Sequence, residues 1–276
     1  MKKFIITVLL LMTGAEAHAI SGSAGVMGYY AFWNPVWKDF YQDIGTDSSF
    51  LYGPVLGLNL PYNFTASVIF LTNYGTEFDY EFKKKLAGDD YTIKFNQTLR
   101  RYDLDSSIGY SLSKMFKIFG GVKYLNLSLP FSDVSNSIKT KDSNGKEISI
   151  NNMYFQGVGP AFGCGLSYPL PIKNLYLSAT MNYLLIYSQM QLSFEQTNTA
   201  AKLYYGSTNT AIKDYIANGG NSTIGLSYYI ESIKAAVMAG YRFQYLYYTK
   251  LDDDPYKING NRDMYHGATF YLVKFF

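Results

Sequence analysis

The carboxyl-terminal segment of the sequence is the strongest indication of the fold, and it reads Asp263-Met264-Tyr265-His266-Gly267-Ala268-Thr269-Phe270-Tyr271-Leu272-Val273-Lys274-Phe275-Phe276. Counting back from the terminus in steps of two gives a mostly apolar set, namely Phe276, Lys274, Leu272, Phe270, Ala268, His266 and Met264. The other set is more mixed and contains small and polar residues, namely Phe275, Val273, Tyr271, Thr269, Gly267, Tyr265 and Asp263. Successive side chains of a strand point to opposite faces, so this pattern predicts a strand with one apolar face, as the wall of a membrane barrel requires.

This terminal strand resembles the closing strand of bacterial outer-membrane β-barrel proteins, which commonly end in Phe with apolar residues at alternate positions before it. The resemblance implies localisation in the outer membrane, contact with its lipid, and recognition of the strand ending at Phe276 by the barrel-assembly machinery. Lys274 departs from the pattern, because the family usually has an apolar residue there. Either Lys274 snorkels to the membrane interface, or the other set of residues faces the lipid.

The amino terminus predicts export. Lys2 and Lys3 precede an apolar run from Phe4 to Met12, and a small-residue segment follows it up to Ala19. This order is typical of a Sec signal peptide, so we expect residues 1–19 to be removed and residues 20–276 to form one barrel domain.

Composition narrows the class further. The chain has 24 basic and 21 acidic residues, and this near balance argues against a nucleic-acid partner. Aromatic residues make up 18% of the chain, with 28 Tyr and 19 Phe, which suits the aromatic girdles of a barrel at both membrane interfaces. Cys164 is the only cysteine, so no intramolecular disulfide can form.

Alternation between turn signals predicts ten strands, at residues 21–33, 50–60, 64–82, 91–112, 117–129, 153–168, 175–188, 221–230, 233–249 and 263–276. The connections alternate between short and longer ones. The predicted fold is therefore an all-β, transmembrane, antiparallel up-and-down barrel with short periplasmic turns and long extracellular loops. Eight or twelve strands also fit, because predicted boundaries shift by about 2–4 residues.

Four local features carry their own expectations. Residues 34–45 predict a short amphipathic helix, either a surface loop helix on the rim or one that lies over the mouth or inside the barrel. The apolar positions change face between Tyr124 and Leu125, because Val122 and Tyr124 share one parity and Leu125, Leu127 and Leu129 share the other, and a β-bulge near Tyr124 would explain the change. A helical turn is expected at residues 210–217. A row of inward glycines from Gly157 to Gly165 leaves room for bulky neighbouring side chains, for a pore or for a ligand.

Catalytic chemistry is sparse in the sequence. His266 is the one histidine beyond the signal segment, and its parity with Phe276 points it toward the lipid. We therefore predict no catalytic residues, no metal site and no cofactor, and an outer-membrane hydrolase is a third option that would need His266.

Charged and polar residues at alternate positions of membrane strands predict the lining of the lumen, and the candidates are Arg101, Asp103, Asp105, Lys234, Arg242 and Gln244. Arg101, Asp103 and Asp105 are expected across the barrel from Arg242. Two functions fit such a lumen. One is a narrow channel for passive transport of small solutes, and the alternative is a non-conducting structural or surface-interaction barrel that acts through its extracellular loops.

Overall fold

The computed structural model describes residues 20–34, 36, 47–73, 76–86, 89–130, 138–141, 147–196, 208–251 and 261–276, and every structural statement below concerns these residues. The predicted signal peptide and most of the helix predicted at residues 34–45 lie outside them. No helix in this part of the chain is long and apolar enough to cross a membrane.

Twelve strands and one short 3-10 helix make up the fold. The strands are β1 (Ser21–Asn34), β2 (Asp47–Asn59), β3 (Phe64–Thr72), β4 (Thr76–Leu86), β5 (Asp89–Ser111), β6 (Phe116–Pro130), β7 (Ile138–Lys141), β8 (Glu147–Pro169), β9 (Leu175–Gln196), β10 (Thr208–Ile230), β11 (Ala235–Lys250) and β12 (Arg262–Phe275). The helix η1 spans Glu231–Ile233.

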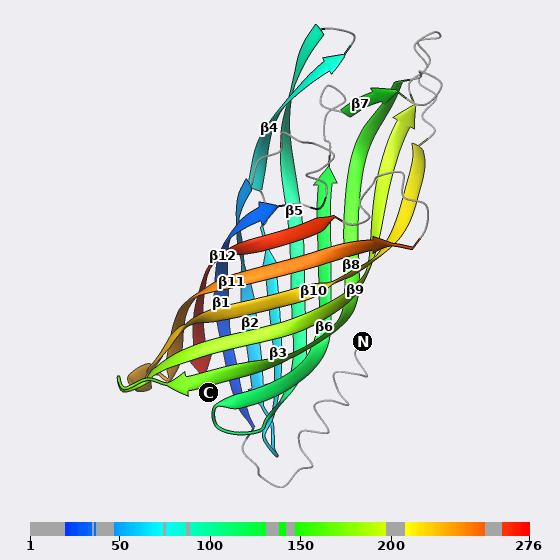
Figure 1. Ribbon diagram of the computed structural model, residues 1–276. Coiled ribbons are helices and arrows are strands. Elements are labelled where there is room, and N and C mark those ends of the chain that lie inside the picture. The colour runs from blue at the N-terminus through cyan, green and yellow to red at the C-terminus, as the bar shows by residue number, and fades with distance from the viewer. Residues whose placement is uncertain are drawn as a thin grey trace.

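Ten of these strands form a closed antiparallel barrel, which confirms the predicted fold class and strand number. The order around the wall is β3-β2-β1-β12-β11-β10-β9-β8-β6-β5, and β5 pairs with β3 to close the ring. β4 pairs with the first half of β5, and β7 pairs with β8. Neither β4 nor β7 belongs to the ring, and both lie beyond the same end of it (Figure 1). Closure leaves no unpaired strand edge in the membrane.

One end of the barrel has short turns and the other has long strand extensions. Residues 60–63, 112–115, 170–174 and 231–234 connect neighbouring strands at the short-turn end, which by the asymmetry of outer-membrane barrels is periplasmic. β5, β8 and β10 have 23 residues each, whereas about 9–11 residues cross a bilayer. These strands therefore project well beyond the opposite end (Figure 1).

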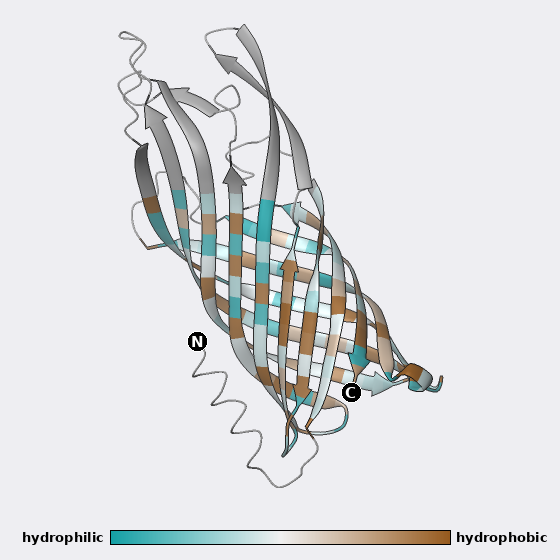
Figure 2. Ribbon diagram, turned by 180° about the vertical axis from the view of Figure 1, so that it is seen from behind, coloured by the Kyte–Doolittle hydropathy of each residue, from teal (hydrophilic) through white to brown (hydrophobic). Residues whose placement is uncertain are grey.

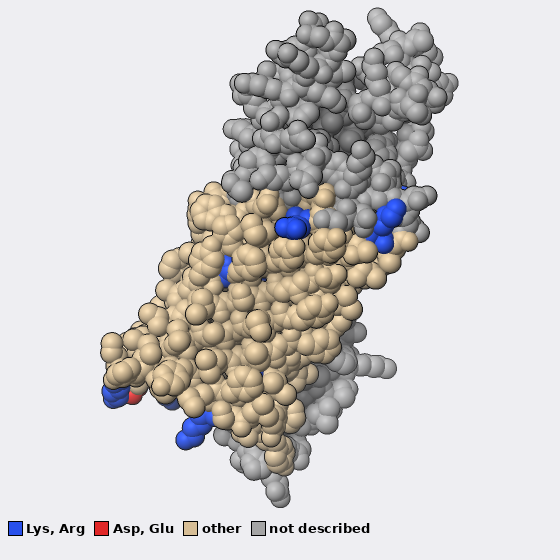
Figure 3. Space-filling model, in the orientation of Figure 1, with Lys and Arg blue, Asp and Glu red and all other residues tan. Residues whose placement is uncertain are grey.

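The wall has an apolar outer face, and the inner face carries the polar groups and a buried core. Colouring by hydropathy shows the alternation along each strand (Figure 2), and the charged side chains on the displayed face lie mainly toward the upper margin and the lower end of the described region (Figure 3). In β12 the outward set is the one that contains Phe270, Leu272 and Phe276, all more than half exposed to the surroundings of the protein. Lys274 belongs to this set, and its ammonium donates a hydrogen bond to the Ile233 carbonyl in the periplasmic turn. Lys274 thus leans toward the interface.

The structure corrects two local predictions. No bulge occurs near Tyr124, because β6 keeps continuous register with both β5 and β8 there. A register shift occurs elsewhere, in the pairing of β8 with β9, between Ile150 and Asn152. Leu125 and Leu127 simply face inward, where they are buried in the core of the barrel. The helical turn expected at residues 210–217 is part of β10, which pairs with β9 along this segment.

Candidate functional site: the barrel lumen

A chain of buried ion pairs occupies the middle of the lumen. Lys123 on β6 donates to the carboxylates of both Asp103 and Asp105 on β5, and its Nζ lies 2.8 Å from Asp105 Oδ1. Arg101 Nη2 lies 3.2 Å from Asp103 Oδ2, and Arg242 Nη2 lies 2.9 Å from Asp105 Oδ2. The Lys123 side chain is completely buried, and only Asp105 among the five is as much as 23% exposed. Buried charges are tolerated only when they are paired, and each carboxylate here has two cationic partners.

The Arg242–Asp105 pair crosses the full width of the barrel. Arg242 is on β11 and Asp105 is on β5, and five steps around the ring separate these strands in either direction. The two side chains therefore meet from opposite walls of the lumen. A contact of this kind narrows the lumen at its level.

Sequence reasoning missed Lys123, although it predicted the four other members of this cluster as residues that line the lumen. The signal was present, because Lys123 stands between outward-facing Val122 and Tyr124 in β6. It was lost because Leu125 and Leu127 were assigned to the outer face through a supposed bulge. An apolar residue on a membrane strand is not necessarily lipid-facing when the lumen itself has a hydrophobic core.

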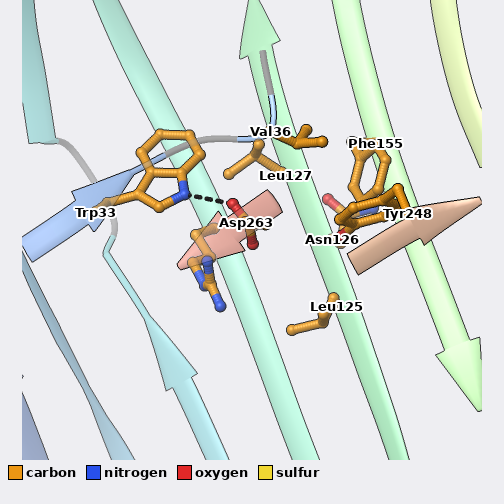
Figure 4. Close-up of a pocket in the computed structure, with 9 residues that line it drawn as sticks. Trp33, Val36, Leu125, Asn126, Leu127, Phe155, Tyr248 and Asp263 are labelled. Atoms are coloured by element: carbon orange, nitrogen blue, oxygen red, sulfur yellow. Dashed lines mark hydrogen bonds between the residues drawn. The ribbon is translucent and has the colours of Figure 1, made fainter. Parts of the chain in front are cut away.

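An aromatic layer lies toward the extracellular side of the ion pairs. The Arg101 guanidinium stacks on the Tyr265 ring at 3.6 Å from its centroid, and Tyr265 stacks on Trp33 with centroids 5.2 Å apart. Trp33 Nε1 donates a hydrogen bond of 2.8 Å to Asp263 Oδ1. Figure 4 shows that hydrogen bond and the small pocket that remains, about 20 Å³ in volume, with Leu125, Leu127, Phe155 and Tyr248 among its lining residues. This layer therefore has room for about one water molecule.

Two predicted lumen residues remain, and one of them, Gln244, faces the lumen whereas the other, Lys234, does not. Gln244 is 2% exposed on the inner face of β11, next to Tyr265 in register, and its amide nitrogen has no hydrogen-bond partner in the described part of the chain. Lys234 does not join the lumen. It is exposed in the periplasmic turn after η1 with φ of 50°, so it precedes β11 rather than forming its first inward position.

Below the ion pairs, on the periplasmic side, the lumen holds a cavity of about 370 Å³. Asp105 and Arg242 line its inner end, whereas Asn59, Lys117 and Phe275 line it close to the short turns. Hydroxyl and amide side chains contribute much of the rest, among them Ser23, Thr65, Ser67, Ser107, Ser178, Thr180, Asn182, Asn221 and Thr223. Among the described residues, the lumen is thus tightly packed in its extracellular half and hollow in its periplasmic half.

The inner glycines of β8 make room for neighbouring side chains. A Cβ at Gly163 would lie 2.8 Å from the Phe119 ring, and one at Gly165 would lie 2.8 Å from Cε of Lys117. Of the uses expected for this row, the structure shows that bulky neighbours fill the space.

His266 lies on the outer face of β12. It stacks on Phe32 with ring centroids 5.6 Å apart, and its Nδ1 lies 2.6 Å from the Tyr241 hydroxyl. Both aromatic partners are more than 40% exposed on the outer face, so His266 belongs to an interfacial aromatic row. Within the described ranges, no group of three or more His, Cys, Asp or Glu side chains could hold a metal ion.

Comparison with protein families shows which family this chain belongs to. The model described as Legionella pneumophila major outer membrane protein precursor matches residues 76–261, which is more than half of the chain. The chain belongs to this family. Members of the family are outer-membrane proteins, in agreement with the barrel and its apolar outer face, so this protein resides in the outer membrane.

Solved structures of outer-membrane barrels are similar in general form. The protease OmpT from Escherichia coli has 9% sequence identity and a TM-score of 0.43, with 95% of this chain and 98% of that chain covered. The translocator domain of the autotransporter NalP from Neisseria meningitidis has 12% identity and a TM-score of 0.40, with 99% and 94% covered. The toluene transporter TodX from P. putida has 9% identity and a TM-score of 0.34, with 94% and 90% covered. Among the curated proteins, none matches this chain. These likenesses are too distant to transfer an activity.

Proposed function

We propose that this protein is a closed outer-membrane barrel that acts at the cell surface through its extracellular side, rather than an open pore. The observation that carries this proposal is the Arg242–Asp105 ion pair between opposite walls. The aromatic layer around Trp33 and Tyr265 lies directly above it. Together they fill the lumen twice along the path that a solute would take.

The long strands support the surface role. β8, β9 and β10 are 23, 22 and 23 residues long, about twice what a bilayer crossing needs. Neighbouring strands remain paired along these extensions. For example, β10 pairs with β9 continuously from Thr208 opposite Glu195 to Tyr215 opposite Ser188. A rigid extension of this kind presents its connecting loops to external partners, and loops on rigid scaffolds often carry function.

Single-channel recording in planar bilayers tests the proposal. The refolded protein is compared with Arg242→Ala and Asp105→Ala, and with Lys173→Ala as a control in an exposed periplasmic turn. We expect no steady conductance from the unaltered protein or the control, and openings in the two lumen variants. Steady conductance from the unaltered protein would overturn the proposal.

A narrow channel for passive transport of small solutes is the second candidate, and the periplasmic cavity favours it. The cavity already gives solutes about 370 Å³ of space in the periplasmic half of the path. Its expected signature is conductance in the unaltered protein with an ion selectivity that changes in Arg242→Ala and Asp105→Ala.

We further propose that the protein is not an enzyme. The placement of His266 against Phe32 and Tyr241 on the outer face supports this, because a hydrolytic base must reach a substrate in water. Hydrolase activity toward peptide or ester probes that disappears in His266→Ala would contradict it.

Assembly is proposed to depend on the terminal strand. Phe276 exchanges backbone hydrogen bonds with Gly22 at both N and O, at 3.0 Å each, so the final residue takes part in closing the barrel. We propose that the assembly machinery recognises this strand and that the surrounding partner is outer-membrane lipid. Removal of Phe276 is expected to lower the amount of folded protein in the outer membrane, measured by heat-modifiable migration on gels. Unchanged assembly would contradict this role.

A further inference from the structure

The periplasmic half of the lumen is a built cavity rather than a packing defect. Its volume of about 370 Å³ falls in the range of small-molecule sites, roughly 300–1,000 Å³. The Asp105–Arg242 pair closes its inner end. A molecule that enters from the periplasmic side therefore meets this ion pair at the inner end of the cavity.

Lys117 supplies an unpaired cation to this cavity. The charged residues of the lining are Lys117, Arg242 and Asp105, and the last two form an ion pair with each other. No carboxylate of the described residues lies within ion-pair distance of Lys117. The cavity thus has one positive charge without a partner, held where a soluble anion can reach it.

The position of Lys117 is set by its neighbours. Its stem lies over Gly165 of β8, where even a Cβ would approach Cε to 2.8 Å, and its ammonium is 5.9 Å from the centroid of the Phe119 ring. Phe119 in turn lies over Gly163, where a Cβ would approach its ring to 2.8 Å. Because residues 163 and 165 are glycines, the Lys117 stem and the Phe119 ring can both lie directly against β8.

Uncharged hydrogen-bonding groups line the same cavity as this cation. Thr180, Asn182, Asn221 and Thr223 line the cavity, and none of them forms a side-chain hydrogen bond within the described part of the chain. Asn221 is only 6% exposed, so its amide is held inside the wall and faces the cavity. Hydroxyl and amide groups can donate to and accept from a ligand that carries hydroxyl groups of its own.

We infer that this cavity binds a small, hydroxyl-rich anion from the periplasm, of the class of a sugar phosphate, with Lys117 pairing the anionic group and the Thr and Asn side chains contacting the hydroxyls. The inference goes beyond the proposed function, because a closed barrel can hold a ligand in its periplasmic half. Binding requires no conduction, so the two proposals fail independently.

Titration calorimetry of the refolded protein in detergent micelles tests this assignment with glucose 6-phosphate, glucose and inorganic phosphate as probes. We expect saturable binding of glucose 6-phosphate, at least about tenfold tighter than that of either other probe, since a charged hydrogen bond contributes about that much. No saturable binding of glucose 6-phosphate would overturn the inference. Inorganic phosphate that binds as tightly would also overturn it, because the hydroxyl contacts would then contribute nothing.

Three variants locate the site. Lys117→Met keeps an unbranched stem on Gly165 and removes the charge, so glucose 6-phosphate is expected to bind at least about tenfold more weakly. Gly165→Ala keeps the charge but displaces the stem, and a severalfold loss is expected. Lys173→Met removes an exposed lysine outside the cavity and is expected to bind as the unaltered protein does. Equal affinity in Lys117→Met and the unaltered protein would overturn the assignment, and heat-modifiable migration shows that each variant has folded.

Discussion

The two halves of the lumen differ although the same strands build both. In the extracellular half, Trp33, Tyr265 and Leu127 pack together over Arg101 and leave a pocket of about 20 Å³. In the periplasmic half, short hydroxyl and amide side chains line a cavity of about 370 Å³. The size of the inward side chains, rather than the number of strands, therefore decides whether this barrel is filled or hollow at a given height.

The ion pairs form the boundary between these halves. Lys123, Asp103 and Asp105 are held on one wall, and Arg242 reaches them from the other. The boundary should be intolerant of change, because removal of one partner leaves uncompensated buried charge.

Lys123→Met is expected to have the largest effect. The change leaves Asp103 and Asp105 facing each other with only their arginine partners, and loss of a buried ion partner costs about 3–5 kcal/mol. Reversible denaturant unfolding in lipid vesicles measures the free energy of unfolding. Lys117→Met in the hollow half is the matched control and should change it by less than about 0.5 kcal/mol, as surface substitutions do. A loss of under 1 kcal/mol in the free energy of unfolding for Lys123→Met would resemble the effect of a surface substitution. Both halves would then tolerate substitution equally well.

Cysteine labelling compares water access to the two halves directly. In a Cys164→Ser background, Ser178→Cys places a thiol in the periplasmic cavity, and Ala217→Cys places one on the inner face of β10, where Ala217 is completely buried. The buried thiol at residue 217 can react only when the structure opens locally, and an opening free energy of about 3 kcal/mol slows the reaction by roughly 100-fold. A polar maleimide should therefore label the cavity thiol at least that much faster than the buried one. Comparable labelling rates in folded protein would show that water reaches both halves.

Trp33→Phe tests the extracellular layer alone. The substitution keeps an aromatic ring beside Tyr265 but removes the donor to the buried Asp263 carboxylate, so we expect a loss of about 1–3 kcal/mol in the free energy of unfolding. Phe32→Leu, on the adjacent outward position, is the control and should lose less than Trp33→Phe. If the control loses as much, then aromatic area, and not the buried hydrogen bond, accounts for the effect.

Contacts in the periplasmic turns should contribute least to the free energy of unfolding. The Asn174 side chain and then Lys173 lower the pKa of the Glu231 carboxyl, and the Lys173 Nζ lies 3.3 Å from Glu231 Oε2. A lowered pKa in the folded state stabilises the protein above the ordinary glutamate range, and this stabilisation is lost as the pH falls through the lowered value. Glu231→Gln should therefore leave stability at pH 7 unchanged within error, because exposed pairs contribute little, and should remove a small decline at acidic pH. A clear loss of stability at pH 7 would contradict this ranking.

The fold was predictable because membrane strands obey a strict two-residue period. Phe270, Leu272 and Phe276 face the lipid and must therefore be apolar. Because side chains alternate along a strand, the residues directly next to them in sequence must face the lumen. The same argument predicted that Arg101, Asp103, Asp105 and Arg242 face the lumen, because charges on the lipid face are costly. It failed for Leu125 and Leu127, where the inner face is apolar too and the period loses its contrast.

Alternation and turn chemistry are local properties of the chain, so the barrel class, the ten-stranded wall and the facing of most strands could be predicted before any contact was known. Which inward side chains meet depends on the folded ring. Arg242 contacts Asp105 across the barrel, Lys123 bridges two aspartates, and Lys117 lies over Gly165. These contacts depend on strand tilt and register around a closed ring, which bring residues distant in sequence to the same height. Tight packing in one half of the lumen and a cavity in the other follow from that closure.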